Sequence, residues 1–372
     1  MNKLLHELKK VSGRLLFPLL IPSRKTHTDK ILILKNDSVG DFLLFSGILN
    51  FHIKHFGDGV YCLVNNNLED MAKLYTNNVI VIDKNRYFAS ISYRHRLLKQ
   101  LNDIGFGMAI NSILNSSESR DILQILKIPK TYLYEGSLSK LKDYNFWRKR
   151  ADIIPSFKIF DDKGMYINIL NHEMHYMEKI LNLKVSDDDI KPHIPLKDVV
   201  SETLINKFSL HKGKYIVFSL SSGDPKRNYP IKEFIEVIKH FHNKLNTKAV
   251  LIGLDQYDLE DRLNNLSAFV VDLRRKTSLI EDFAIIKHAR FFIGNETGIT
   301  HASWIMGVLT VMIYGGGQFG RFHPIYKNGY IVNKYMDCYY CNWNCRYDDT
   351  PVPCIKNISA SDIIKLSEEI LS

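Results

Sequence analysis

The sequence predicts an α/β protein with two Rossmann-like domains that face each other across a polar cleft. Short apolar runs typical of buried strands alternate with stretches of helical periodicity along most of the chain. The alternation is interrupted once, by a segment that holds Pro192 and Pro195, and then restarts. Each series opens with a strand, a loop and a helix, at Ile31 and at Tyr215. Parallel sheets covered by helices on both faces produce this pattern.

The chain length of 372 residues suffices for two domains of ordinary size. We expect a basic amphipathic N-terminal extension, a first Rossmann-like domain, a linker, a second Rossmann-like domain with a cysteine cluster, and a C-terminal helix. Their expected bounds are 1–30, 31–190, 191–212, 213–358 and 359–372. The C-terminal helix could return to the first domain.

The composition, with 45% hydrophobic and 24% charged residues, is that of a globular protein and does not indicate disorder. The net charge of +10 suits an acidic partner, such as a nucleic acid, an anionic lipid surface or a phosphorylated substrate. No long basic block and no nucleic-acid-binding motif accompanies this charge. We therefore expect no nucleic-acid partner.

No apolar run in the sequence approaches the roughly 20 residues that span a bilayer. The best candidate, residues 15–21, is short, contains Pro18 and lacks a small-residue cleavage site, so it is a poor signal peptide. Five cysteines, four of them clustered near the C-terminus, do not resemble a secreted disulfide framework. These features predict a cytoplasmic protein.

Residues 1–30 predict a basic amphipathic helix. Apolar residues recur at helical spacing, at Leu4, Leu5, Leu8, Val11, Leu15 and Leu16. Basic residues fill much of the other side of the helix, at Lys3, Lys9, Lys10 and Arg14. Such a helix can lie on an anionic membrane surface. The alternative is a helix packed on the domain or on a second subunit.

The first strand, residues 31–34, leads into a loop that contains Gly40 and Asp41. Ligands of doubly wound domains bind outside the carboxyl ends of such strands. The loop lacks the G-x-G-x-x-G pattern, so no dinucleotide fingerprint is present. Asp41 has two interpretations, as an N-cap of the next helix or as a base at the cleft.

Residues 136–162 are rich in basic and aromatic side chains. They form either a loop that binds an acidic acceptor at the cleft or a solvated surface loop.

In the second domain, the strand over residues 215–220 ends in a Ser/Gly-containing loop with adjacent basic residues. Its candidate ligand-binding residues are Ser221, Ser222, Lys226 and Arg227. A loop of this kind at a helix start suits a diphosphate; the alternative is an ordinary basic loop. Asp255 follows the next strand, where a carboxylate often binds ribose hydroxyls, although a capping Asp looks the same. Thr277 opens a later helix and is a further substrate-binding candidate.

Residues 290–324 read as strand, loop, helix, strand and loop. A turn over residues 294–298 precedes a helix over 299–306, and a β-rich run over 308–314 leads into three glycines, 315–317. Free backbone N–H groups at a glycine-bounded helix start form an anion site that suits nucleotide phosphates. The alternative is an ordinary strand-to-helix turn.

Four cysteines have the spacing C-x2-C-x3-C-x8-C: Cys338, Cys341, Cys345 and Cys354. Thiols this close in a cytosolic chain predict a structural zinc or iron site. The alternatives are free thiols or a disulfide. Any metal there would be structural, because four protein ligands leave no open position. Cys62 stands apart and is expected in the core.

Three of these segments resemble glycosyltransferase family 9, the ADP-heptose:lipopolysaccharide heptosyltransferases. Residues 31–41 resemble the family's opening strand and Gly-Asp loop, and residues 221–230 resemble a segment that ends in Lys-x-Trp-Pro. Residues 294–301 resemble the signature Asp-Thr-Gly-x-x-His. The segments occur in the right order and at the right separation, and the resemblance extends from about Ile31 to the C-terminus.

The resemblance implies a GT-B fold, with an acceptor-side N-terminal domain and the sugar nucleotide held mainly by the C-terminal domain. It implies that Asp41 deprotonates the acceptor hydroxyl. The leaving diphosphate would be neutralised by Lys226, Arg227 and the amides of Thr297 and Gly298. The further substrate-binding positions are Ser221 and Ser222 near the phosphates, Asp255 near the ribose, Thr277, Glu296 and His301.

The family's reaction inverts the anomeric centre and needs no catalytic metal. The implied partners are a nucleotide-sugar donor and a lipid-linked or glycan acceptor, from a lipopolysaccharide core or a related surface glycan. The basic charge suits peripheral contact with the anionic inner face of the inner membrane. A sugar leaving a diphosphate passes through an oxocarbenium-like transition state, which fixed positive charge and amide donors stabilise.

Three positions depart from the family pattern. Glu296 stands where Asp is usual, Tyr229 replaces Trp, and Arg227 occupies what is most often the Lys position. These departures leave open a non-heptose donor. A non-catalytic nucleotide-sugar-binding protein on the same fold is a second alternative, against which Asp41 counts.

Overall fold

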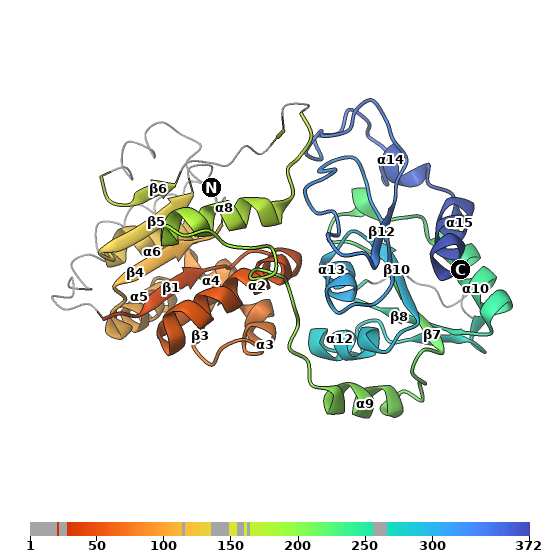
Figure 1. The fold of residues 1–372 in the computed structure, drawn as a ribbon, viewed down its shortest axis with the longest axis horizontal. Helices are drawn as coiled ribbons and strands as arrows, with labels where there is room; N and C mark the ends of the chain where they lie inside the picture. The colour runs from red at the N-terminus through yellow and green to blue at the C-terminus, as the bar shows by residue number, and fades with distance from the viewer. Residues whose placement is uncertain are drawn as a thin grey trace. The chain divides into compact units, whose positions relative to one another are not determined.

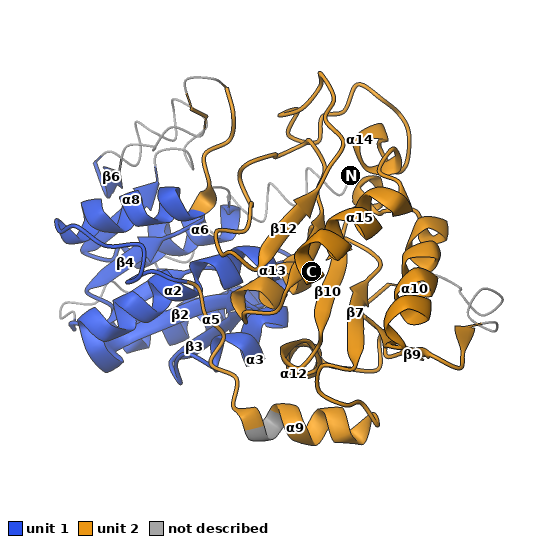
Figure 2. Cartoon of the chain, turned by 45° about the vertical axis from the view of Figure 1, so that its right-hand side comes forward, with its two compact units in different colours: residues 1–157, 170–191 blue, residues 158–169, 192–372 orange. Residues whose placement is uncertain are grey.

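The computed structural model describes residues 21, 28–113, 116–134, 149–154, 160–161, 164–255 and 266–372. The chain divides into two compact units, which Figure 2 colours separately. The first comprises residues 1–157 and 170–191, and the second comprises residues 158–169 and 192–372. Each unit contains one six-stranded sheet in which all the pairings are parallel, so the predicted α/β class is confirmed.

The first unit is built on a sheet with the strand order β3-β2-β1-β4-β5-β6 (Figure 1). Its strands are β1 Ile31–Leu34, β2 Val60–Asn65, β3 Val79–Ile82, β4 Met108–Asn111, β5 Lys130–Tyr134 and β6 Asp152–Ile154. Its helices are α2 Val39–Phe56, α3 Glu69–Ala72, α4 Lys84–Tyr87, α5 Ile91–Ile104, α6 Ser117–Leu126 and α8 Ile169–Leu181. The central strand β1 is buried along its whole length, as its four apolar residues predict.

The core of the first unit also contains a buried ion pair. The guanidinium of Arg94, on α5, lies 2.6 Å from the carboxylate of Asp121, on α6, and both side chains are buried. The Tyr87 hydroxyl donates to the same carboxylate at 2.9 Å. This network ties α4, α5 and α6 together on one side of the sheet.

The second unit has the strand order β12-β11-β10-β7-β8-β9. Its strands are β7 Tyr215–Ser219, β8 Lys248–Ile252, β9 Val270–Asp272, β10 Phe291–Asn295, β11 Thr310–Ile313 and β12 Gly329–Val332. Its helices are α9 Asp198–Lys207, α10 Ile231–Leu245, α12 Leu279–Lys287, α13 Gly298–Ile305, α14 Pro353–Lys356 and α15 Ala360–Leu371. Residues 192–212, at the expected linker, belong to this unit, where α9 packs against α12.

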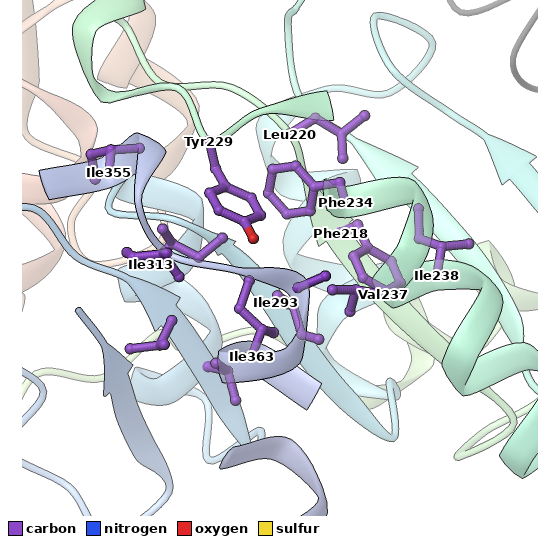
Figure 3. Close-up of a cluster of buried hydrophobic side chains, with 14 of the residues drawn as sticks. Phe218, Leu220, Tyr229, Phe234, Val237, Ile238, Ile293, Ile313, Ile355 and Ile363 are labelled. Atoms are coloured by element: carbon purple, nitrogen blue, oxygen red, sulfur yellow. The ribbon is translucent and has the colours of Figure 1, made fainter. Parts of the chain in front are cut away.

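The C-terminal helix α15 belongs to the second unit, so the expectation that it could return to the first domain is wrong. It packs against α10, and buried Ile363 enters the cluster around Phe234, Val237 and Ile238 (Figure 3). Its start is fixed because the Ala360 backbone N–H donates to Glu233, on α10, at 2.9 Å. The apolar face of α15 therefore packs within the second unit.

Most of the predicted N-terminal extension and most of residues 136–162 lie outside the described residues. Among the residues that are described, no helix combines the length and the apolar character needed to cross a membrane.

Candidate active site

Both sheets reverse their strand order next to the strand that opens the unit. The reversal lies between β1 and β4 in the first sheet and between β7 and β10 in the second. Loops that leave the carboxyl ends of two such strands diverge to opposite faces and leave a crevice where α/β proteins bind ligands. Asp41 follows β1, Lys226 and Arg227 follow β7, and Glu296 follows β10, so the main candidates lie after strands at these two points.

In the first unit, Ser38 is the N-cap of α2, and Asp41 lies in the first turn. The Ser38 hydroxyl accepts a hydrogen bond from the Asp41 backbone N–H and donates one to Asp41 Oδ2 at 2.5 Å. The capping interpretation of Asp41 is therefore wrong, because the cap is three residues earlier. The half-buried carboxylate is held in place by Ser38 instead.

A buried charge cluster that sequence reasoning missed lies beside this loop. The Lys35 ammonium lies 2.9 Å from Asp37 and 3.5 Å from Glu173, on α8, and donates to the Ser112 carbonyl at 3.3 Å. Burial opposes the charge on Lys35, but the carboxylates of Asp37, Glu173 and Asp41 raise its pKa. Burial raises the pKa of Glu173 to about 7, against the pull of Lys35. The one sequence signal for this cluster is the position of Lys35 directly after an apolar strand.

In the second unit, the loop after β7, residues 220–230, is braced by its own side chains. Ser222 Oγ donates to the Asp224 carbonyl at 2.7 Å and to Asn228 Oδ1 at 3.0 Å. The Asn228 carboxamide also accepts from the Ser222 backbone N–H at 2.6 Å. Ser222 therefore shapes the loop, and its neighbour Ser221 is half-buried. A short 3-10 turn, Pro225–Arg227, presents the two basic residues.

Asn295, at the end of β10, fastens this loop to the neighbouring strand. Its Nδ2 donates to the Leu220 carbonyl, and its Oδ1 accepts from the Tyr229 backbone N–H, both at 2.9 Å. The side chain is fully buried. Nothing in the local sequence singles out Asn295 within its turn, because both of its partners are backbone groups of a distant segment.

Glu296 links the loop after β7 to helix α13. Its Oε2 lies 3.0 Å from Arg227 Nη1, and its Oε1 lies 3.2 Å from His301 Nε2. Trp304 Nε1 donates to His301 Nδ1 at 3.2 Å, so Nδ1 is the acceptor nitrogen and Nε2 carries the proton directed at Glu296. The carboxylate is thus oriented from both sides, with His301 buried behind it.

Helix α13 begins beside this pair. Thr297 is its N-cap, and the Thr297 side chain accepts from the Thr300 backbone N–H. The Thr300 hydroxyl donates back to the Asn295 carbonyl at 2.5 Å. The helix start at Gly298 therefore offers backbone N–H groups close in sequence to Glu296, in an arrangement that favours an anion.

Asp255 and Thr277 lie in separate polar clusters. Arg274 Nη1 lies 2.6 Å from Asp255 Oδ1, and the same guanidinium lies 2.7 Å from Asp272. Asp255 Oδ2 is buried, and it has no hydrogen-bond partner among the residues that the structure describes. The Thr277 hydroxyl donates to Asp282, on α12, at 2.6 Å. Arg274 was missed, because nothing in the sequence sets it apart from the adjacent Arg275.

The predicted metal site at the four cysteines stays a prediction. Within the described residues, which include all four, no group of three or more His, Cys, Asp or Glu side chains is arranged to hold a metal ion. Cys354 is buried and accepts a hydrogen bond from the Gly316 backbone N–H, whereas the other three are half-buried. Burial raises the pKa of Cys338 and Cys354, and the neighbouring thiols raise both further. The thiols are therefore near one another without forming a ligand set. Cys62 is buried in the core, as predicted.

Known proteins resemble this chain along most of its length. Lipopolysaccharide heptosyltransferase 1 of Campylobacter coli is 23% identical over 359 residues, which cover 92% of this chain and 98% of the relative. The fold matches that of a family 9 glycosyl transferase from Veillonella parvula, with a TM-score of 0.71, 19% identity, and 94% and 99% of the two chains covered. It also matches the ADP-heptose heptosyltransferase II of E. coli, with a TM-score of 0.68, 14% identity, and 92% and 98% covered.

A more distant match is TibC, an iron-containing dodecameric glycosyltransferase of enterotoxigenic E. coli. The TM-score is 0.54 at 13% identity, with 93% of this chain and 80% of TibC covered. These likenesses identify the fold as GT-B. The sequence pattern of glycosyltransferase family 9 (heptosyltransferase) matches residues 94–348, which is more than half of the chain. The chain therefore belongs to glycosyltransferase family 9, and it is a glycosyltransferase.

Proposed function

We propose that this enzyme transfers a heptose from ADP-heptose to a lipopolysaccharide or lipooligosaccharide core acceptor, with inversion at the anomeric carbon. Its relatives carry the names of enzymes with this activity. The observation that carries the proposal is the pair formed by Arg227 and Glu296, where the loops after β7 and β10 meet. A cationic side chain and the start of α13 are together at a position typical of nucleotide binding.

On the donor side, Arg227, Lys226 and the amides at Thr297 and Gly298 bind the diphosphate. As the bond between the anomeric carbon and the phosphate oxygen breaks, negative charge grows on the leaving ADP. Fixed positive charge and backbone donors stabilise this transition state more than the ground state, because the charge is greater there. Ser221 and Ser222 shape the loop around the phosphates.

Glu296 has two roles in the proposal. Its carboxylate orients the guanidinium of Arg227, and it faces the donor sugar from the position where the family usually has Asp. His301 and Trp304 hold the carboxylate from behind. The additional methylene of Glu, compared with Asp, lets the side chain reach both Arg227 and His301.

Asp255 is proposed to bind the ribose hydroxyls. Arg274 neutralises and orients the carboxylate through Oδ1, and Oδ2, which has no partner within the described part of the chain, is proposed to accept from a hydroxyl. Thr277 supports the same side of the unit through its hydrogen bond to Asp282.

On the acceptor side, Asp41 is proposed to be the general base. It accepts the proton of the attacking hydroxyl while that oxygen forms the new bond to the anomeric carbon. The hydrogen bond from Ser38 orients the carboxylate for this step.

Two further proposals concern the surroundings of the reaction. The basic N-terminal residues 1–30 are proposed to bring the enzyme to an anionic membrane surface that carries the acceptor. The four cysteines are proposed to take up a structural zinc or iron. Four thiols in a 17-residue stretch, from 338 to 354, support the second proposal, as does the iron named for TibC. Metal analysis of protein purified without chelators tests it, and metal-free protein with four titratable thiols would refute it.

The experiment for the proposed function measures transfer from ADP-heptose to a heptose-deficient lipopolysaccharide core acceptor by the purified enzyme. Formation of ADP and extended core, with the α or β configuration opposite to that of the donor, is the expected result. If the enzyme binds and turns over a different nucleotide sugar but not ADP-heptose, it is a glycosyltransferase whose donor is not ADP-heptose. Vesicle sedimentation with and without anionic lipid tests the membrane proposal, with a variant that lacks residues 1–30 as its control.

A further inference from the structure

The segment that carries the cysteines lies against the loop that holds Lys226 and Arg227 and against the three glycines that follow β11. We name residues 336–354 the cysteine segment and residues 315–317 the glycine loop. The Tyr340 and Asn342 backbone N–H groups donate to Gly316 and Gly317 carbonyls, both at 2.8 Å. At its other end, the Val352 N–H donates to the Lys226 carbonyl at 3.0 Å. The cysteine segment therefore joins the glycine loop to the loop that holds the basic pair.

Trp343, in the middle of the cysteine segment, contacts both loops with its ring. A Cβ atom added at Gly315 would lie 2.8 Å from Trp343 Cη2, and one added at Gly317 would collide with the same ring. The guanidinium carbon of Arg227 lies over the ring, 5.5 Å from its centroid. Glu296 binds Nη1 of the same guanidinium, so Arg227 contacts both the Trp343 ring and the Glu296 carboxylate.

The backbone of Trp343 has an uncommon conformation for a bulky residue. Its φ is +62°, and Tyr340 and Asn342 have φ values of +68° and +50°. Side chains with a large ring rarely occupy this left-handed region, and such strain persists where surrounding contacts fix it, often at functional sites. The hydrogen bonds from Tyr340 and Asn342 to the glycine loop hold the backbone in this conformation, and in this conformation the Trp343 ring faces Arg227.

We propose that Trp343 is a positioning residue for the donor: its ring holds the Arg227 guanidinium in the orientation that receives the diphosphate. This inference rests on the proposed function, because it requires that Arg227 binds the diphosphate. An arginine stacks well on an indole, since the flat cation meets the negative face of the ring. Holding the side chain in advance lowers the conformational entropy that binding would otherwise cost.

The test is a double-mutant cycle on the full-length enzyme, with Trp343→Ala, Arg227→Ala and the double variant. ADP affinity is measured by titration calorimetry, and kcat and KM are measured for the donor and for the acceptor. We expect Trp343→Ala to weaken ADP binding about tenfold and to leave the acceptor KM unchanged. In the Arg227→Ala background, the same substitution should change ADP affinity by less than about twofold.

A matched pair of variants distinguishes an effect of the aromatic face of Trp343 from an effect of its apolar volume. The same pair replaces Trp343→Ala if that variant does not fold. Trp343→Phe keeps an aromatic face under Arg227, whereas Trp343→Leu keeps only apolar volume. Phe should retain ADP affinity within about threefold of the wild type, and Leu should behave like Ala. Equal losses from Trp343→Ala with and without Arg227, or equal affinities of the Phe and Leu variants, would overturn the proposal. Wild-type ADP affinity in Arg227→Ala would instead refute the role of Arg227, and the inference with it.

Discussion

Nη1 of Arg227 lies 3.0 Å from Oε2 of Glu296, and this pair joins two loops separated by 69 positions in the sequence. The other oxygen of Glu296 contacts His301, so one carboxylate orients a cation on one side and a buried imidazole on the other. The Asp that the family usually carries here is one methylene shorter. Glu296 therefore has a reach that is matched to both partners in this chain.

Shortening or neutralising Glu296 should lower donor turnover. We expect Glu296→Asp to lower kcat/KM for the donor about tenfold, because Asp cannot contact Arg227 and His301 together, and Glu296→Gln to lower it at least as much through loss of charge. Steady-state kinetics with varied donor measures both. If Glu296→Asp is as active as the wild type, the additional methylene has no function in the site.

Removing the proposed base should affect catalysis rather than binding. We expect Asp41→Asn to lower kcat by a factor of about 100 to 10,000, with donor affinity unchanged, because a general base contributes at this scale. Ser38→Ala is the comparison variant, since it removes the hydrogen bond from Ser38 to Asp41 but keeps the carboxylate. It should cost about 1 kcal/mol of stability through the lost helix cap, and it should lower kcat by less than Asp41→Asn does, because a base is still present. Asp41→Asn with near-wild-type kcat would refute the assignment.

The buried Asp282 should make the stability of the enzyme depend on pH. Burial raises its folded-state pKa to about 7, far above the ordinary value of 3.8, despite the hydrogen bond from Thr277. The folded state therefore binds a proton that the unfolded state has already lost, and stability falls as pH rises from about 4 to about 7. Asp282→Asn removes this contribution and keeps an acceptor for Thr277.

Urea unfolding at pH 5 and at pH 8 checks this prediction. The free energy of unfolding of Asp282→Asn should exceed that of the wild type by more at pH 8 than at pH 5, with a difference on the order of a few kcal/mol. Parallel curves for the two proteins across this range would show that Asp282 has an ordinary pKa.

Breaking the buried pair of Arg94 and Asp121 should be strongly destabilising. We expect Asp121→Ala to lower the free energy of unfolding by roughly 3–5 kcal/mol, because it leaves a guanidinium buried without its carboxylate. The double variant Arg94→Met with Asp121→Leu should lose much less, since no charge remains buried. Denaturant unfolding measures both, and equal losses would show that the pair itself, rather than the orphaned charge, stabilises the unit.

Local patterns were sufficient to predict the two Rossmann-like units. The apolar run of β1 and the helical periodicity after it are properties of consecutive residues, and parallel sheets follow from their alternation. The positions of Lys226, Arg227 and Glu296 after their strands followed from the same reasoning together with the family resemblance.

The contacts between distant segments could not be predicted in this way. Asn295 binds backbone groups of a loop far away in the sequence, and Arg274 binds Asp255 from another strand end. Glu173 lies on a helix whose pattern does not show that it is buried beside Lys35. The cysteine spacing likewise does not show that Tyr340 and Asn342, between the cysteines, donate backbone hydrogen bonds to the glycine loop.

The glycine loop also limits the order in which this part of the sequence can change. A side chain at Gly316 would collide with the ring of Tyr339, and one at Gly317 would collide with the ring of Trp343. Any replacement of these glycines must therefore follow, and cannot precede, the loss of the facing aromatic residue. Homologues that differ here should have exchanged both partners, and those that kept Trp343 should have kept Gly317.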